Sequence, residues 1–146
     1  MTLYSVLKQS HSLLAIIAIV LLCITVIFSI TGFYQKKEYT VKNFRMGLFT
    51  LTVTHLQLLL GLILYFTSPL FSQWSALGGK VMKDASLRKM LVEHPFGVIL
   101  GITLITIGWV LHKKQKTSQK AFGKIALFFA LGLICILSVI PWGTWF

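Results

Sequence analysis

The stretch that decides the fold is SLLAIIAIVLLCITVIFSITGFY, residues 12–34, which contains no charged side chain. In a helix rising 1.5 Å per residue, about 20 residues cross the roughly 30 Å hydrocarbon core of a bilayer. A removable signal peptide is the competing interpretation, but this run is longer than a typical h-region and no A-x-A-like cleavage site follows it. We therefore predict a transmembrane helix over residues 12–34 that stays in the mature protein.

Three further apolar runs follow, within helices that we expect over residues 46–66, 85–111 and 121–140. In the run within residues 85–111, the third along the chain, only residues 95–111 are uncharged. Asp84 is a suitable N-cap residue, which extends this expected helix back to residue 85. Pro95 then lies inside this helix, where we expect a kink because proline removes one backbone hydrogen bond. The sequence therefore predicts an all-α fold, a four-helix transmembrane bundle that forms a single membrane domain over residues 1–146.

Composition and charge support this assignment. Of the residues, 56% are hydrophobic and 12% are charged, and the net charge is +11. A nucleic-acid-binding protein is one reading of so basic a chain. The basic residues, however, lie between the apolar runs instead of forming one stripe, as expected for the loops of a membrane protein. We expect the lipid bilayer as partner and no nucleic acid.

The distribution of Lys and Arg predicts the orientation. The connection between the first two runs holds four, and the segment from the end of the third run into the fourth holds five. The opposite face holds only five, which are Lys8, Lys80, Lys83, Arg88 and Lys89. Because cytoplasmic loops carry the excess of Lys and Arg, we expect both chain termini on the non-cytoplasmic side.

Histidines are prominent among the few polar residues of the apolar runs. His112 ends the third run among lysines, where a helix C-terminus favours positive charge, and we assign it no chemistry. His55 lies nine residues past Met46, about 13 Å into the membrane. Ionisable groups at such depth usually face a bundle interior, a cavity or a partner. The alternative is a packing role, in which a neutral imidazole forms a hydrogen bond with a neighbouring helix and Thr52, one turn away, helps to satisfy it.

His11 and His94 form the sharper candidate site. Each precedes an apolar run at the outer boundary, and because their two helices run parallel, the histidines are expected to meet. A six-coordinate haem iron needs two imidazole nitrogens only about 4 Å apart, by analogy with other imidazole–metal bonds. Gly97 and Gly101 lie on the same helical face as His94 and would leave room for a flat macrocycle. The alternative is that Gly97-x-x-x-Gly101 serves helix packing without a cofactor.

His55 is too deep to share an iron with His11 or His94. A second haem or a quinone carbonyl is its possible redox partner. The two cysteines, Cys23 and Cys135, carry no CxxC spacing and are read as packing residues. The sequence also lacks the motifs of hydrolases and nucleotide-driven pumps, such as G-x-x-x-x-G-K-[ST] and H-E-x-x-H.

Several segments resemble a family of small bacterial four-helix membrane proteins known as cytochrome b-like. They are Ser10-His11-Ser12-Leu13-Leu14, Thr54-His55-Leu56-Gln57, Val92-Glu93-His94-Pro95 and Ile140-Pro141-Trp142. The resemblance implies a haem b protein of electron transport in the bacterial inner membrane, with His11, His55 and His94 as haem or redox residues. It also implies other membrane subunits or a homo-oligomer as partners.

Two function classes remain open at this point. One is electron transfer through haem b, alone or as a subunit of a respiratory complex. The other is a non-enzymatic accessory subunit without cofactor, which packs against a larger complex through its glycine-bearing faces. A small transporter is a weaker third class, because no internal repeat is evident.

Overall fold

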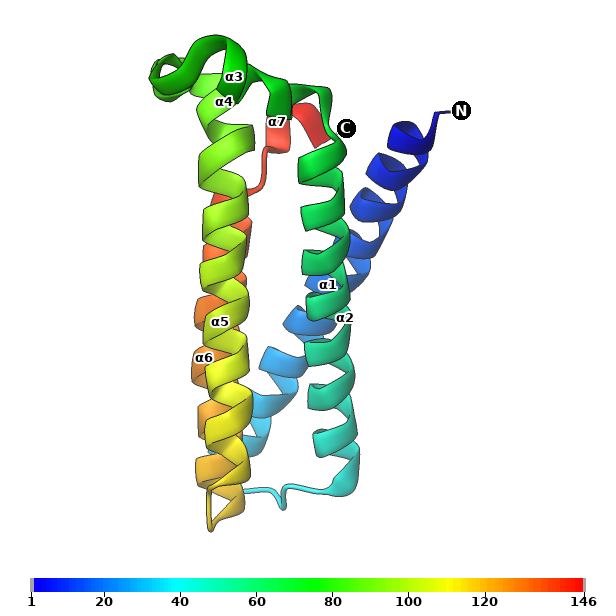
Figure 1. The fold of residues 1–146 in the computed structure, drawn as a ribbon. Helices are drawn as coiled ribbons and strands as arrows, with labels where there is room; N and C mark the ends of the chain where they lie inside the picture. Colours follow the sequence, from blue (N-terminus) through cyan, green and yellow to red (C-terminus); the bar gives the residue numbers. More distant parts are fainter. Residues whose placement is uncertain (1, 146) are drawn as a thin grey trace.

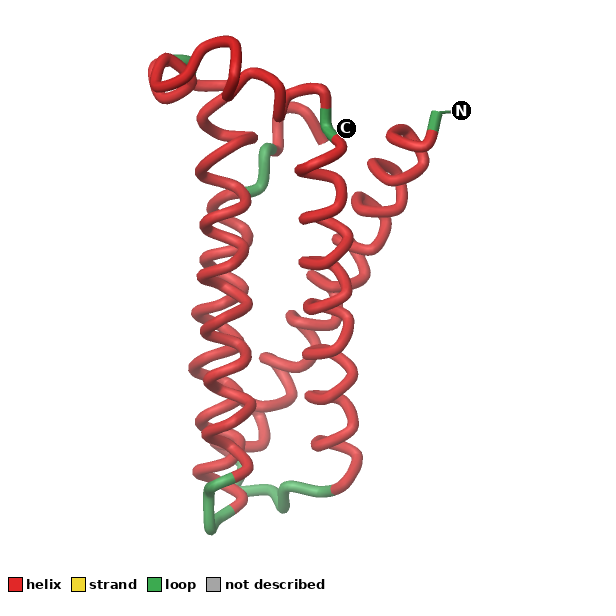
Figure 2. The backbone as a smooth tube through the Cα atoms, in the orientation of Figure 1, coloured by secondary structure: helices red, strands yellow, loops and turns green. Residues whose placement is uncertain are grey.

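The computed structural model describes residues 2–145, and within them all regular structure is helical. Four helical segments are long and apolar enough to cross a membrane, which confirms the predicted number of spans. They are α1 (Leu3–Tyr34), α2 (Val41–Thr67), the third span Ala85–Lys113, and α6 (Ser118–Val139). Figure 2 shows short connections after α1 and after the third span, and a longer, largely helical connection between α2 and the third span.

The first two helices begin earlier than the apolar runs predict. Thr2 caps α1, because its hydroxyl accepts a hydrogen bond from the Ser5 backbone N–H at 3.2 Å. Thr40 caps α2 in a capping box with Asn43. Polar capping residues therefore set these helix starts, and hydropathy does not. As a consequence, His11 lies well inside α1 and not before it.

The third span is continuous but not uniform. The Asp84 side chain accepts from the Leu87 backbone N–H at 2.9 Å, as expected of an N-cap. The span then runs through α4 (Ala85–Arg88), a π-helical turn η3 (Lys89–Glu93) and α5 (His94–Lys113). Pro95 lacks the backbone N–H that would bond back into the preceding turn, and that turn is the π turn. A π turn holds one residue more than an α-helical turn, so it adds one residue ahead of His94. Such turns occur frequently at functional sites.

Each long helix packs against two neighbours, so that the four form a closed ring. The pairs are α1 with α2, α2 with α5, α5 with α6, and α6 with α1. Figure 1 shows α5 and α6 closely side by side, while the N-terminal part of α1 leans away from the others. Helices α1, α5 and α6 share an apolar core, against which Leu51 of α2 packs: Leu22, Val26, Ile105, Trp109, Ile125 and Phe129.

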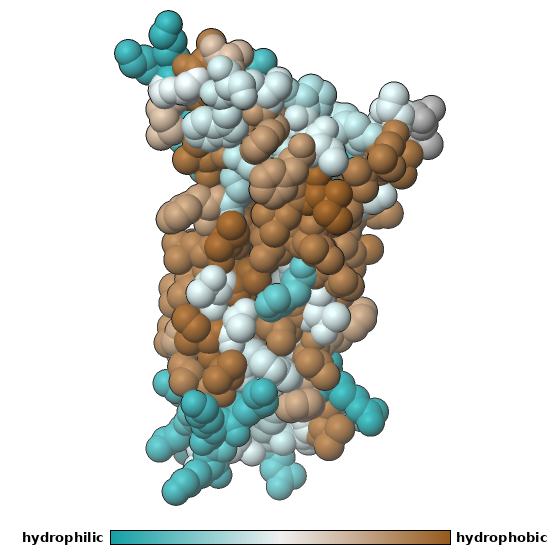
Figure 3. All heavy atoms as spheres, in the orientation of Figure 1, coloured by the Kyte–Doolittle hydropathy of each residue, from teal (hydrophilic) through white to brown (hydrophobic). Residues whose placement is uncertain are grey.

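Both chain ends lie at one end of the bundle, and the connections that follow α1 and α5 lie at the other (Figure 1). The segment after α2 caps the first end through η1 (Pro69–Ser72), α3 (Gln73–Leu77) and η2 (Gly78–Lys83). The Trp74 indole N–H donates to the Tyr65 hydroxyl at 3.1 Å, and that hydroxyl donates to the Leu91 carbonyl at 3.1 Å. Between the ends, Figure 3 shows a broad apolar band, which suits contact with a lipid bilayer.

Candidate functional site

The structure brings His11 of α1 and His94 of α5 together near the end of the bundle that carries both termini. Their ring centroids are 6.3 Å apart and their planes are inclined by 85°. Both side chains are half-buried. The expected meeting of these two residues is therefore present, while their role as ligands stays a prediction.

A backbone hydrogen bond fixes the protonation of His94. Its Nδ1 lies 3.1 Å from the Val139 carbonyl oxygen of α6. A carbonyl only accepts, so Nδ1 carries the hydrogen and the neutral ring leaves its lone pair on Nε2. Metal-ligating histidines almost always hold their second nitrogen in this way. His94 is thus oriented to offer Nε2 as a ligand atom.

Gln57 of α2 positions His11. The Gln57 side-chain amide donates to the His11 carbonyl oxygen at 2.9 Å, and the same nitrogen lies 3.2 Å from His11 Nδ1. Its two hydrogens therefore serve the His11 backbone and ring together, with Nδ1 as acceptor. In this tautomer Nε2 of His11 carries the ring hydrogen and offers no lone pair. The ring rests on Gly61, where an added Cβ would lie 3.0 Å from His11 Cε1. Gln57 Oε1 is buried and has no hydrogen-bond partner within residues 2–145.

Gln57 and Gly61 were not predicted as site residues. Both lie in the segment that begins Thr54-His55-Leu56-Gln57, and they are four residues apart, so they share one face of α2. That spacing is the signal in the sequence for these two residues. It identifies them as neighbours of His11 only once this face of α2 is known to pack against α1.

An ionic cluster lies next to His94. Glu93 Oε1 accepts from Arg88 Nε at 2.9 Å, and Glu93 Oε2 lies 3.7 Å from Lys89 Nζ. Lys89 Nζ also donates to the Ser138 carbonyl at 3.3 Å, which connects the cluster to α6. Two cations thus flank the single carboxylate beside the histidine pair. The local charge is net positive.

The glycine face of α5 does not line the histidine site. Helix α6 fills the space beside it: a Cβ on Gly101 would lie 2.8 Å from the Gly132 carbonyl oxygen, and one on Gly97 would overlap the Val139 side chain. The expectation that Gly97 and Gly101 leave room for a macrocycle is therefore corrected. They allow close approach of α5 and α6, which is the helix-packing alternative.

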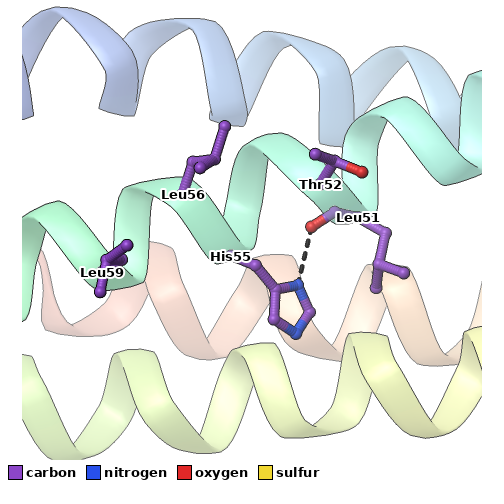
Figure 4. Close-up of a pocket in the computed structure, with 5 residues that line it drawn as sticks. All are labelled: Leu51, Thr52, His55, Leu56 and Leu59. Atoms are coloured by element: carbon purple, nitrogen blue, oxygen red, sulfur yellow. Dashed lines mark hydrogen bonds between the residues drawn. The ribbon is translucent and has the colours of Figure 1, made fainter.

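His55 lies on the outer surface of the bundle and not in its interior. The ring extends from α2 toward α5, and its Nδ1 lies 2.7 Å from the Leu51 carbonyl oxygen (Figure 4). Its Nε2 lies 3.2 Å from the hydroxyl of Thr106. Thr52 is not its partner, because that hydroxyl donates to the Leu48 carbonyl. Depth along the helix was predicted, but the direction of the side chain was not.

His112 lies in the last turn of α5 beside Lys113, as expected, but its side chain is buried within the bundle. It is 3% exposed and packs against the rings of Trp109, Tyr39 and Phe44. Its Nε2 has no hydrogen-bond partner within the described chain. Burial raises the pKa of Tyr39, in the connection after α1, to about 12, so that hydroxyl stays protonated at neutral pH.

The donor set limits what the histidine pair can bind. Residues 2–145 contain no group of three or more His, Cys, Asp and Glu side chains placed to hold a metal ion. A pair of imidazoles instead suits an iron whose other ligands come from a macrocycle. Comparison with family models, curated proteins and solved structures found no match for this chain.

Proposed function

We propose that this chain is a b-type haem-binding membrane protein that serves electron transfer, as its resemblance to the cytochrome b-like proteins implies. The observation that carries the proposal is the His11–His94 pair. Two imidazoles on opposite sides of one iron, each with an iron–nitrogen bond of about 2 Å, have ring centres roughly 6 Å apart. The centroid separation of 6.3 Å agrees with that requirement.

The surrounding residues support this use of the pair. Val139 holds His94 in the tautomer that offers Nε2, and Gln57 holds His11 by its backbone carbonyl. To bind iron through Nε2, His11 would carry its ring hydrogen on Nδ1, and the Gln57 amide would give up its contact with that nitrogen. Helices α1, α2, α5 and α6 all contribute, so the two rings are positioned by the whole bundle. The bound haem would supply a reversible one-electron change at iron. Arg88 and Lys89 would provide positive charge near its anionic propionate edge.

The orientation and location belong to the same proposal. The end with both termini carries five Lys and Arg against nine at the other end, so we place the termini on the non-cytoplasmic side. The histidine pair then lies toward that side of a bacterial inner membrane. Another membrane subunit, or a second copy of this chain, would exchange electrons with it.

The accessory-subunit alternative loses its main support in this structure. It relied on glycine-bearing faces that pack against a larger complex, whereas Gly97 and Gly101 are covered by α6 of the same chain. We retain this class only as an outcome of the test.

The test is an optical spectrum of the purified protein, expressed with ample haem and recorded oxidised and then reduced with dithionite. We expect a Soret band and one haem per chain. His11→Ala and His94→Ala each should lose most of the haem, whereas His55→Gln, on the exposed surface, should keep it. Circular dichroism checks that each variant remains helical. A colourless wild type, or alanine variants with full haem content, would contradict the proposal.

A further inference from the structure

Pro95 leaves one backbone carbonyl of the third span without its usual donor. In an α-helix each carbonyl accepts from the backbone N–H four residues later, and for Leu91 that residue is Pro95. Proline has no backbone N–H, so this bond cannot form. Leu91 is 4% exposed, and a lipid bilayer offers no donor in place of water. The Leu91 carbonyl therefore needs a donor from elsewhere in the fold.

The hydroxyl of Tyr65, on α2, supplies that donor. It lies 3.1 Å from the Leu91 carbonyl oxygen, and the Trp74 indole nitrogen lies 3.1 Å from the same hydroxyl. An indole N–H only donates and a carbonyl only accepts, so the single hydrogen of the Tyr65 hydroxyl must point to Leu91. Because the hydroxyl accepts one bond and donates the other, each bond polarises and strengthens its neighbour. The direction of the chain is thereby fixed, from Trp74 through Tyr65 to Leu91.

The turn that Tyr65 holds is the one that leads into His94. Leu91 belongs to the π turn η3 and precedes His94 by three residues, so its carbonyl points along the helix axis toward His94 and Pro95. The ring of His94 is fixed from another helix, because its Nδ1 lies 3.1 Å from the Val139 carbonyl oxygen of α6. His94 is thus held from two sides, its backbone turn by α2 and its ring by α6.

One side of α2 contacts the supports of both histidines. Gln57, Gly61 and Tyr65 follow each other at intervals of four residues, so they lie along the same side of the helix. Gln57 donates to the His11 carbonyl at 2.9 Å, and the His11 ring rests on Gly61. Tyr65, one turn further along, reaches the turn before His94. The two rings are therefore positioned relative to one helix, although they come from α1 and α5.

We propose that Tyr65 is a positioning residue for His94, because its hydroxyl replaces the N–H that Pro95 lacks and holds the turn from which the ligand ring projects. This inference rests on the proposed function, in which His94 binds the haem iron. It adds a residue that acts through the backbone of His94 and not through its ring. It also explains how a proline can directly follow a ligand histidine without loosening the helix there.

Tyr65→Phe tests this role, because it removes the hydroxyl and keeps the ring that packs against Phe66 and Phe71. The full chain is studied without haem in lipid nanodiscs with 15N-labelled histidine. The His94 Nδ1 resonance is assigned by its loss in His94→Ala. We expect Tyr65→Phe to shift or broaden this resonance, because a loosened turn changes the hydrogen bond between His94 and the Val139 carbonyl.

Tyr4→Phe is the matched control. The Tyr4 hydroxyl lies 3.5 Å from the Ser68 hydroxyl, so this variant also loses one tyrosine hydroxyl that bridges two segments of the chain. It leaves the turn before His94 untouched, and the His94 Nδ1 resonance should stay in place.

Pro95→Ala provides the rescue. Alanine restores a backbone N–H that can donate to the Leu91 carbonyl, so that carbonyl no longer depends on Tyr65. In the haem-loaded protein we expect Tyr65→Phe alone to lower haem affinity about tenfold, as for other residues that orient a metal ligand. In the Pro95→Ala background the same change should cost less than about threefold. A hydroxyl that only stabilises packing would leave haem affinity unchanged in both backgrounds.

Two results would overturn the inference. One is a His94 resonance that stays in place in Tyr65→Phe, or that moves as much in Tyr4→Phe. The other is an equal loss of haem affinity from Tyr65→Phe with and without Pro95→Ala. A wild type that binds no haem contradicts the proposed function separately, because the resonance of the haem-free protein still reports whether Tyr65 holds His94. The two failures are therefore read from different signals.

Discussion

Replacing Gln57 by leucine tests whether Gln57 positions His11 for haem or only stabilises helix packing. The change removes the amide contacts to the His11 carbonyl at 2.9 Å and to His11 Nδ1 at 3.2 Å. Side-chain hydrogen bonds between membrane helices average about 0.6 kcal/mol each, so loss of both contacts should lower the free energy of unfolding by about 1 kcal/mol. The change also removes the buried Gln57 Oε1, which has no hydrogen-bond partner among residues 2–145 and whose desolvation costs about 1–3 kcal/mol. The two effects oppose each other, and the haem-free protein should change little in stability.

Haem affinity should respond differently from stability. Gln57 positions His11 through the His11 carbonyl, and loss of a residue that orients a metal ligand typically costs about 10- to 100-fold in affinity. We expect Gln57→Leu to weaken haem binding at least about tenfold, which corresponds to about 1.4 kcal/mol. The assay is titration of haem into haem-free protein, followed by the Soret absorbance. Thermal unfolding of the same sample gives the stability.

A matched control lies at the opposite end of the bundle. The Gln119 side-chain amide donates to the Phe33 carbonyl at 3.3 Å, which is the same kind of contact between helices. Gln119→Leu should therefore lower stability slightly and leave haem affinity unchanged. Equal haem affinity in the Gln57→Leu and Gln119→Leu proteins would refute the reasoning.

Three further changes test the packing of the bundle. Gly132→Val should separate α6 from α5, since an added Cβ would lie 2.6 Å from the Gly101 carbonyl oxygen. We expect the free energy of SDS-induced unfolding to fall by about 3 kcal/mol or more. Gly79→Ala is the control and should cause no loss, because nothing lies within 4 Å of a Cβ added there. Thr25 and Thr50 share a buried hydrogen bond of 2.8 Å between α1 and α2. A double-mutant cycle with valine at both positions should give a coupling energy of about 0.6 kcal/mol. Absence of coupling would show that this bond does not stabilise the protein. His112→Phe removes one hydrogen bond, from Nδ1 to the Trp109 carbonyl, together with an Nε2 that has no partner within residues 2–145. Aromatic rings surround the site, so stability should stay within about 1 kcal/mol and haem content should not change; loss of haem would assign His112 a role that we do not give it.

Hydropathy along the chain predicts the four spans because each crosses the same thickness of lipid. It does not predict where helices begin. Thr2 and Thr40 set the starts of α1 and α2 by hydrogen bonds that no average over apolar residues detects. The π turn before His94 likewise depends on how the backbone adjusts ahead of Pro95.

The candidate site is predictable to the extent that it depends on depth. Parallel spans place His11 and His94 at one level, and the structure has them in contact. The direction of a side chain around the helix depends on which neighbours pack where. For that reason the sequence left open which side of α2 carries His55, which lies on the outer surface, while Gln57, two residues later, faces His11. Gly101 faces α6 for the same reason.

The most direct measurement of the central claim is the electron paramagnetic resonance spectrum of the oxidised, haem-loaded protein. Two imidazole ligands on one iron give a low-spin ferric signal, and ring planes inclined by 85° should make that signal strongly anisotropic. The account predicts this signal in the wild type and its loss in both His11→Ala and His94→Ala. A high-spin signal alone, or a low-spin signal that survives either substitution, would contradict it.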